Sequence, residues 1–254
     1  MRILITAGGT AETIDQVRSI TNHSSGSLGV ALAKAALQKG MITVDYLYAK
    51  GALLPPKDPR ITLYPVTDTA TLQKTMEQLL QDQTYDAVIH AMAVSDFTPE
   101  IAATQEDFIQ GMNTWLATKK DTTFEPTDVA DLLRAIQKKS QSATKLSSNT
   151  EHLFLVLKQT PKVIGRIKEL QPTTQLVGFK LLVGVPVSEL LQVARASLEK
   201  NQADYILAND LTSIREGHHH GYLLDKKGLV AEADTKADIA HLILDTLLER
   251  QETR

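Results

Sequence analysis

The sequence predicts an α/β protein with a Rossmann-like, doubly wound and mostly parallel sheet, extended by a helical insertion and a C-terminal β-hairpin. Three observations lead to this class. The chain opens on an apolar run, Arg2–Ala7 (RILITA), that breaks directly into Gly8 and Gly9. Apolar runs of strand length then alternate with segments of helical period, as in βαβ units. No repeat with a period of about 20 to 50 residues is visible, which argues against a repeat protein.

The first part of the chain is expected to alternate regularly between strands and helices. The strand-length runs are rich in β-branched and aromatic residues, whereas the segments between them place apolar residues at helical spacing. Gly40 is a typical helix stop, and Asp68 or Thr69 is a typical helix cap. The expected elements are a strand at 2–7, a helix at 28–39, strands at 42–49 and 61–66, a helix ending near residue 83 and a strand at 87–94.

The run Ala87–Val94 (AVIHAMAV) contains no Asp, Glu, Lys or Arg and is expected to be a central parallel strand covered on both faces. Ligands of open α/β sheets bind beyond the carboxyl ends of the strands. The residues that follow this run, Ser95, Asp96 and Phe97, are therefore expected at the binding edge, and Asp96 is a candidate site residue.

Residues 99–150 interrupt this alternation and are expected to form a helical insertion. Helices are expected at Ile101–Thr118 and Thr127–Lys139, and the apolar face of the first suggests packing on the parent domain or on a partner subunit. The alternation then resumes. The later expected elements are strands at 153–159, 175–182 and 203–210, helices at 161–170 and 188–200, a hairpin turning at 225–228 and a final helix at 236–250.

Composition limits the class of protein. The chain has 254 residues, a formal net charge of −3 and no cysteine. We expect one nucleotide-binding domain over residues 1–254, with the insertion at about 99–150. Met1 and Arg2 lead straight into a strand, so no signal peptide is expected, and no apolar stretch approaches the roughly 18 residues of a membrane span. We therefore expect a cytoplasmic protein that binds neither membranes nor nucleic acid.

The opening strand is expected to feed a nucleotide-binding loop. Without a Cβ, the backbone N–H groups of Gly8 and Gly9 can approach a phosphate chain, and the Thr10 hydroxyl can add a donor. A second anion site is expected at Ser24, Ser25 and Gly26, because the positive end of the following helix would point at it. Two such sites suggest a triphosphate.

Other interpretations of this opening remain. The glycines can simply form a tight turn, and the spacing matches neither the dinucleotide fingerprint nor a P-loop. A nicotinamide- or flavin-binding oxidoreductase is a second function class, but the acidic residue expected after its second strand is replaced by Tyr48, Ala49 and Lys50. A non-catalytic nucleotide sensor is a third.

Six strings occur in a characteristic order: ITAGGTAETIDQVRSITNHSSGSLG, AVSDF, KLSS, TPKVI, VGFKL and KNQADYILANDL. Their order and spacing resemble the phosphopantothenoylcysteine synthetase (phosphopantothenate–cysteine ligase) family of coenzyme A biosynthesis nearly end to end. The chain looks like the stand-alone form, since nothing precedes Met1 that could be the flavin-dependent decarboxylase fused to it in many bacteria.

The resemblance implies a two-step ligation. A nucleoside triphosphate activates the carboxylate of 4′-phosphopantothenate as an acyl-nucleotide with release of pyrophosphate, and L-cysteine then attacks to form the amide. CTP is the expected nucleotide, with ATP as the alternative because the KLSS region also resembles the eukaryotic enzymes. Mg²⁺ is the expected cofactor, no flavin is expected, and the family implies a homodimer. No metal ligands are assigned.

The same resemblance implies roles for three residues. Lys145 matches the motif lysine tied to acyl-nucleotide formation, and Asn22 matches the asparagine associated with the intermediate and with cysteine attack. Arg18 matches an arginine that meets the phosphate of phosphopantothenate, across a dimer interface in the family. Two of them also have a structural alternative: Lys145 as a solvated lysine, and Asn22 as a helix-start cap.

Further nucleotide- and substrate-binding residues are carried over by the same match. The first group is expected to bind the nucleotide and comprises His90, Ala91, Met92, Asp96, Pro161, Lys162, Val163, Ile164, Phe179 and Lys200. Asn209, at the end of an apolar strand, is expected to bind substrate. The chain departs from the family pattern at Ser147, Ser148 and Ala196, where lysines are usual, and Arg195 or Lys180 can replace the last of these. A metal site at residues 218–220 is disfavoured, because alternate residues of a strand face opposite ways.

Overall fold

A computed structural model describes residues 1–119, 123–140, 149–215 and 217–252. The chain divides into two compact units. The large unit comprises Met1–Thr10, Asn22–Val94 and Lys162–Arg254, and the small unit comprises Ala11–Thr21 and Ser95–Pro161.

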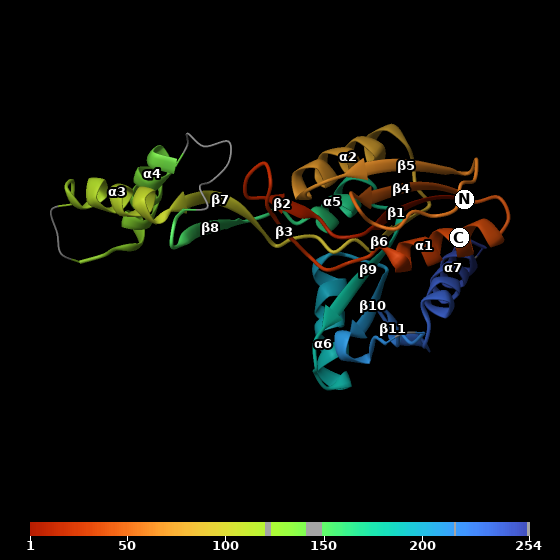
Figure 1. The fold of residues 1–254 in the computed structure, drawn as a ribbon. Helices are drawn as coiled ribbons and strands as arrows, with labels where there is room; N and C mark the ends of the chain where they lie inside the picture. The colour runs from red at the N-terminus through yellow and green to blue at the C-terminus, as the bar shows by residue number, and fades with distance from the viewer. Residues whose placement is uncertain (120–122, 141–148, 216, 253–254) are drawn as a thin grey trace. The chain divides into compact units, whose positions relative to one another are not determined.

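The large unit is built on an eight-stranded sheet with the order β12-β11-β10-β9-β6-β1-β4-β5 (Figure 1). The six strands from β10 to β5 are parallel, and β11 and β12 add an antiparallel hairpin at one edge. The strands are β1 (Arg2–Ala7), β4 (Thr43–Ala49), β5 (Ile61–Val66), β6 (Ala87–His90), β9 (Gln175–Leu182), β10 (Tyr205–Asp210), β11 (Gly221–Asp225) and β12 (Gly228–Ala233). The predicted α/β class, the mostly parallel sheet and the C-terminal hairpin are confirmed.

The order of the parallel strands matches that of a doubly wound dinucleotide-binding sheet. Numbered by chain order among themselves, they read 3-2-1-4-5-6 from β5 to β10. The winding direction reverses between β1 and β6, where the connections leave for opposite sides. Such a switch point opens a crevice at the carboxyl ends of the strands.

Helices cover both faces of this sheet (Figure 1). Alternation along β1 divides the core: Ile3 and Ile5 belong to one buried cluster and Leu4 to the other. α1 and α7 supply the first cluster, and α2, α5 and α6 supply the second. The helices are α1 (Ser27–Gln38), α2 (Thr69–Asp82), α5 (Val163–Leu170), α6 (Val187–Lys200) and α7 (Lys236–Glu252), with a 3₁₀ turn, η1, at Leu211–Ser213.

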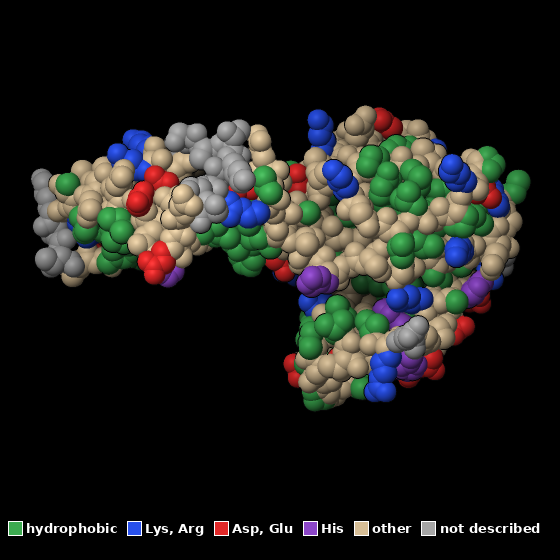
Figure 2. Space-filling model, in the orientation of Figure 1, with side chains coloured by type: hydrophobic (Ala, Val, Ile, Leu, Met, Phe, Trp, Pro, Cys, Tyr) green, Lys and Arg blue, Asp and Glu red, His purple; other side chains and the backbone are tan. Residues whose placement is uncertain are grey.

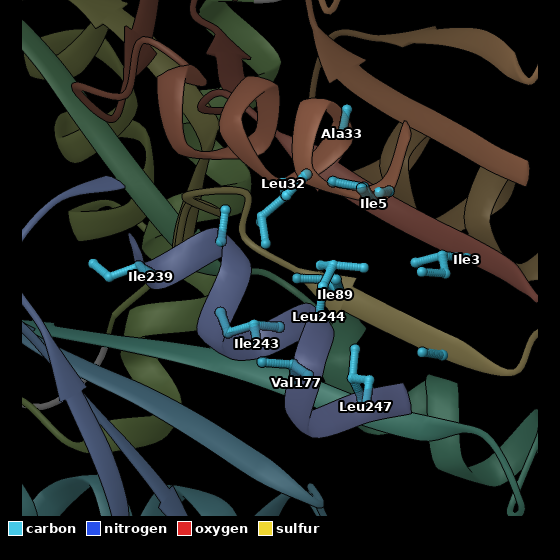
Figure 3. Packing of buried hydrophobic residues seen from close by; sticks show 14 of the residues in the cluster. Ile3, Ile5, Leu32, Ala33, Ile89, Val177, Ile239, Ile243, Leu244 and Leu247 are labelled. Atoms are coloured by element: carbon cyan, nitrogen blue, oxygen red, sulfur yellow. The ribbon is translucent and has the colours of Figure 1, made fainter. Parts of the chain in front are cut away.

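The first cluster packs α7 against the middle of the sheet. In Figure 3, Ile243, Leu244 and Leu247 of α7 lie beside Ile89 of β6 and Val177 of β9. All five side chains are buried. Close packing of this kind holds the central strands and α1 in a fixed relation at the switch point.

The small unit contains a two-stranded antiparallel ribbon and two helices. β7 (Phe97–Thr104) pairs with β8 (Leu153–Gln159). Between these two strands in the chain lie α3 (Gln105–Leu116) and α4 (Pro126–Ser140). Its core holds Ile101, Ala103 and Ile136. Gly111 lets the two helices approach, since a Cβ there would lie 2.6 Å from the Cα of Ile136. A short hairpin, β2 (Ala11–Thr13) with β3 (Ser19–Thr21), also belongs to this unit.

Two predicted elements are corrected. Residues 101–104 were expected to be helical but belong to β7, and α3 begins after Thr104, whose hydroxyl accepts a hydrogen bond from the Asp107 N–H. The strand expected at 153–159 is present as β8, and it pairs with β7 outside the main sheet. The strand expected at 87–94 ends at His90, because the following residues turn away to line a cavity.

The other elements lie close to their expected bounds. The helix expected from Pro161 starts two residues later, with Lys162 as its cap residue, so Pro161 does not occupy the first helical position. Asp68 caps α2 in a reciprocal capping box with Thr71.

The approach of α1 to β1 gives a testable stability prediction. A Cβ on Gly29 would lie 2.4 Å from the Ala7 Cβ and 2.9 Å from the Tyr46 hydroxyl. Gly29→Ala should therefore lower the free energy of unfolding by about 1–3 kcal/mol through overpacking. Gly165→Ala, in α5, is the matched control because a Cβ there meets nothing within 4 Å. It should raise stability by about 0.5–1 kcal/mol through helix propensity. Urea unfolding measures both, and equal effects of the two changes would contradict the packing argument.

Candidate functional site

A cavity of about 350 Å³ opens in the large unit beside the switch point. The part of Figure 2 that holds this unit shows a recess bordered by hydrophobic, histidine and lysine side chains. None of the lining residues that the structure describes is an Asp or Glu. The lining consists of residues 23–29 and 91–93, together with Phe179, Leu181, Asn209, Leu211, Ile214, His219 and Lys236.

One end of the cavity is formed by the N-terminus of α1. The cap residue Gly26 has φ 75° and no side chain caps the helix there, and the first turn holds no acidic residue. Backbone N–H groups of the first turn of a helix have no partner within the helix, and the helix dipole makes this end positive. Lys236, the first residue of α7, adds a cation to the lining. This end of the cavity is suited to an anion.

Glycines bring three backbone segments together next to this end. Gly8 has φ 91°, and a Cβ there would lie 2.7 Å from the Ala52 Cβ. A Cβ on Gly9 would lie 2.5 Å from the carbonyl oxygen of Asn22. At Gly26 it would lie 3.2 Å from the Gly8 nitrogen. The loop after β1, the segment before α1 and the segment after β4 can therefore approach only because these residues are glycines.

The segment after β6 is held by a buried polar network. The Thr6 hydroxyl accepts a hydrogen bond from the Met92 N–H at 3.1 Å and shares another with Nδ1 of His90 at 3.0 Å. The backbone N–H of Ala93 donates to the Gly8 carbonyl, and the backbone N–H of Thr10 donates to the Ala93 carbonyl. Burial lowers the pKa of His90 to about 4, so its ring is neutral near pH 7. The network places residues 91–93 along the cavity wall.

The other end of the cavity is mainly apolar, with two polar side chains. Phe179 and Leu181 of β9, together with Leu211 and Ile214, provide the apolar surface. Nδ2 of Asn209 lies 3.3 Å from Nε2 of His219, and both residues are buried. Burial, with smaller contributions from Lys236 and His218, lowers the pKa of His219 to about 4.

The structure brings many of the predicted site residues of the large unit to this one cavity. Those in its lining are Ser24, Ser25, Gly26, Ala91, Met92, Phe179 and Asn209. Gly8, Gly9, Asn22 and His90 support the lining through the contacts described above. Their roles as ligand-binding residues stay predictions.

Other predicted residues are not brought to the cavity lining. Thr10 is fully buried, and its hydroxyl lies 3.5 Å from that of Thr69. Val163 is buried in the second core cluster, and Ile164 packs against the same cluster. Lys200 ends α6 and precedes β10, so it lies at the amino edge of the sheet, opposite the crevice. Lys162 is an exposed cap residue of α5.

The remaining candidates lie in the small unit or outside the described residues. Asp96, Pro161 and Arg18 belong to the small unit. The guanidinium of Arg18 donates to the Asp15 carboxylate at 2.6 Å, in the turn between β2 and β3. Lys145 and the departures Ser147 and Ser148 fall at positions that the structure does not describe.

Sequence reasoning missed His219 and Lys236 as lining residues. Neither residue lies in a string that resembles a family motif. The three consecutive histidines at 218–220 suggest a metal site from sequence alone, and no other role. In the structure, His219 lines the cavity, whereas His220 contacts the carboxylates of Glu232 and Asp234. Among residues 1–119, 123–140, 149–215 and 217–252, no group of three or more His, Cys, Asp or Glu side chains could hold a metal ion. None of the helices within these ranges is long and apolar enough to cross a membrane.

Comparison with known proteins places this fold in a family. The model of the DNA/pantothenate metabolism flavoprotein C-terminal domain matches residues 1–123 and 116–250. The chain belongs to this family. The family that the sequence motifs predicted is thereby confirmed, and the cavity described above is a feature of one of its members.

Individual relatives show the same relationship. The coenzyme A biosynthesis bifunctional protein CoaBC of Thermococcus kodakarensis is 32% identical over 210 residues, which cover 83% of this chain and 41% of that protein. The crystal structure of the DNA/pantothenate metabolism flavoprotein from Streptococcus pneumoniae is 39% identical, with a TM-score of 0.82, and covers 98% of this chain and 99% of that one. The chain spans less than half the length of the first curated relatives that it matches.

A more distant likeness concerns the fold alone. A Cab2 variant solved in complex with phosphopantothenate-cysteine is 17% identical, with a TM-score of 0.67, and covers 99% of this chain and 86% of that one.

The buried histidines give a pH prediction. The lowered pKa of His90, about 4, lies below the value of about 6.5 in an unfolded chain. Between these values the unfolded chain binds a proton that the folded chain does not. The free energy of unfolding should therefore fall as the pH drops from about 6.5 towards 4, and His219 acts in the same direction. Urea unfolding across this pH range should show a shallower dependence for His90→Gln than for the unchanged protein. Equal slopes would contradict the assignment of a neutral, buried His90.

Proposed function

We propose that the protein is a phosphopantothenate–cysteine ligase that joins 4′-phosphopantothenate to L-cysteine through an acyl-nucleotide made from CTP. The observation that carries this proposal is a single cavity at the switch point whose two ends suit different parts of a nucleotide. Membership of the family, the name of the Thermococcus kodakarensis relative and the phosphopantothenate-cysteine bound to the Cab2 variant support the substrate class.

The two ends of the cavity suggest one orientation of the nucleotide. The triphosphate would lie against residues 24–29, where the α1 N-terminus presents backbone N–H groups and the lining holds no carboxylate. Lys236 would offset further phosphate charge. The base would then lie towards Phe179, where an aromatic ring and aliphatic side chains can cover its faces.

The chemistry requires charge to be offset during the first step. A carboxylate oxygen of 4′-phosphopantothenate attacks the α-phosphorus of CTP, and pyrophosphate leaves. In the second step the cysteine amine attacks the acyl carbon, CMP leaves and the amine loses a proton. We propose Lys145 for the first step, Asn22 for holding the acyl oxygen during the second, and Arg18 for the phosphate of 4′-phosphopantothenate. These roles rest on the motif resemblance, together with the need for donors where negative charge develops.

Mg²⁺ fits this scheme as part of the nucleotide substrate. The described residues offer no cluster of metal-ligating side chains, whereas Mg²⁺ in phosphate-transfer sites is commonly held by phosphate oxygens and water. When bound to the triphosphate it would offset negative charge. The scheme requires no flavin. We further propose that residues 1–254 act as one synthetase domain carrying the 99–150 insertion, and that the protein acts as a homodimer.

A defined assay tests the proposed reaction. We expect pyrophosphate release only when CTP, Mg²⁺ and 4′-phosphopantothenate are all present, because the carboxylate is the nucleophile. We expect 4′-phosphopantothenoylcysteine only after L-cysteine is added. Coupled detection of pyrophosphate and mass spectrometry of the product measure the two steps separately. Pyrophosphate release that is independent of 4′-phosphopantothenate would refute the ligase.

The phosphate end can be tested with two glycines at opposite ends of α1. Gly26 and Gly40 both have positive φ, 75° and 84°, so alanine strains the backbone at either position. At Gly26 the new Cβ would also lie 3.1 Å from the Ala52 Cβ, beside the cavity, whereas at Gly40 it meets nothing within 4 Å. Gly26→Ala should weaken CTP binding by about tenfold or more, and Gly40→Ala should leave it within about twofold. Isothermal titration calorimetry measures both affinities. Equal CTP affinities of the two variants would contradict the proposed binding of the triphosphate at the α1 N-terminus.

A further inference from the structure

The apolar end of the cavity contains one buried polar pair, Asn209 and His219. Asn209 lies next to the end of β10, and His219 lies in the segment before β11, anchored by its backbone N–H, which donates to the Asp234 carbonyl at 2.7 Å. Both side chains line the cavity, and their exposed fractions are 7% each. The mechanism proposed above makes no use of His219.

The chemistry of the pair shows which atoms of Asn209 and His219 already hydrogen-bond to each other. An amide nitrogen only donates, so Nε2 of His219 accepts the hydrogen bond from Nδ2 of Asn209, at 3.3 Å. The ring is neutral near pH 7, so its single proton lies on Nδ1. That nitrogen is buried and has no hydrogen-bond partner among the described residues. In this orientation of the carboxamide, the ring is the acceptor towards Asn209.

The hydrogen bond to His219 determines which atom of the Asn209 side chain a ligand can contact. With Nδ2 turned to His219, Oδ1 is the acceptor that the carboxamide has left, and it makes no hydrogen bond with any residue in the described ranges. Side chains of Phe179, Leu181, Leu211 and Ile214 make most of this end of the lining apolar, and Lys236 lies close enough to His219 to contribute to its lowered pKa. A hydrogen bond beside apolar surfaces is selective, because leaving a buried polar group without a partner is costly.

We infer that His219 is a positioning residue for nucleobase selection: it holds the Asn209 carboxamide so that Oδ1 accepts a hydrogen bond from the exocyclic amino group of cytosine. Adenine carries an amino group of the same chemistry. Uracil and guanine present a carbonyl oxygen at the corresponding edge, which would place two acceptors against each other. This inference rests on the proposed function, because it requires a nucleoside triphosphate in the cavity.

Direct nucleotide binding tests the inference without relying on the ligation reaction. Dissociation constants for CTP, UTP, ATP and GTP, with Mg²⁺, are measured by calorimetry on the full chain. The unchanged protein should bind CTP about tenfold or more tightly than UTP. His219→Leu removes the acceptor, so that the carboxamide can turn either way, and should reduce the CTP-to-UTP ratio to below about threefold. A His219 that merely supported the fold would weaken both nucleotides equally.

Two control variants separate positioning from folding. His219→Gln supplies an amide oxygen that can accept from Asn209 Nδ2, so the CTP preference should persist. His218→Gln changes a neighbouring histidine that is exposed and is not among the cavity-lining residues, and should behave like the unchanged protein. Thermal unfolding of all variants shows whether they fold. Comparison of ATP with GTP shows whether the amino edge is read on a purine as well.

The outcomes distinguish this inference from the proposed function. Equal affinity of the unchanged protein for CTP and UTP, or an unaltered ratio in His219→Leu, would overturn the inference while the ligation assay still stood. Selective CTP binding that is lost in His219→Leu, without any pyrophosphate release, would support the inference and refute the ligase. Absence of nucleotide binding would overturn both.

Discussion

The cavity depends on how closely the start of α1 approaches the end of β1. Gly29 has no side chain, and a Cβ would lie 2.4 Å from that of Ala7, so the helix lies directly on the strand. This contact aims the first turn of α1 at the carboxyl edge of the sheet, where the connections that follow β1 and β6 leave for opposite sides. Gly8 and Gly26 let the adjoining loops close behind it. A bulkier residue at any of these points would move the positive helix end, and with it the anion-binding end of the cavity.

Two polar pairs then shape opposite parts of the cavity wall by similar means. Thr6 with His90 holds residues 91–93, and Asn209 with His219 forms the polar part of the apolar end. In each pair, burial keeps an imidazole neutral by lowering its pKa to about 4. A neutral ring can accept or donate at a fixed atom without the cost of a buried charge. The cavity is thus formed by the protein's own contacts, and a ligand would meet groups that are already oriented.

Much of the large unit could be predicted because its periodicity has a direct physical cause. Ile3 and Ile5 face one core and Leu4 the other, so β1 reads as a strand buried on both faces. Asp68 predicts the start of α2 correctly because its side chain caps that helix. In the small unit the same reasoning failed at Ile101, where a short apolar run suits a helix or a strand equally well. The strand β8 was predicted, but its partner β7 was not, because an apolar run does not reveal which strand it will pair with.

The candidate site was predictable only where its residues lie in long motifs. Ser24 to Gly26 and Asn209 were found in this way and line one cavity. Lys236 and His219 are brought there by the hairpin of β11 and β12 and by the start of α7, which no local pattern connects with residue 24. Gly8 and Gly9 allow the close approach of Ala52 and Asn22, and their expected approach to phosphate stays a prediction.

These contacts show what a local glycine pattern can predict and what it cannot. Glycine spacing makes close approach possible but does not say whether the neighbour will be a ligand or another backbone segment, since both demand the same missing Cβ. Here Gly9 lies against the Asn22 backbone and pairs with Ala93, so the loop after β1 contacts both the segment before α1 and the segment after β6. The first turn of α1, the next element, borders the cavity directly.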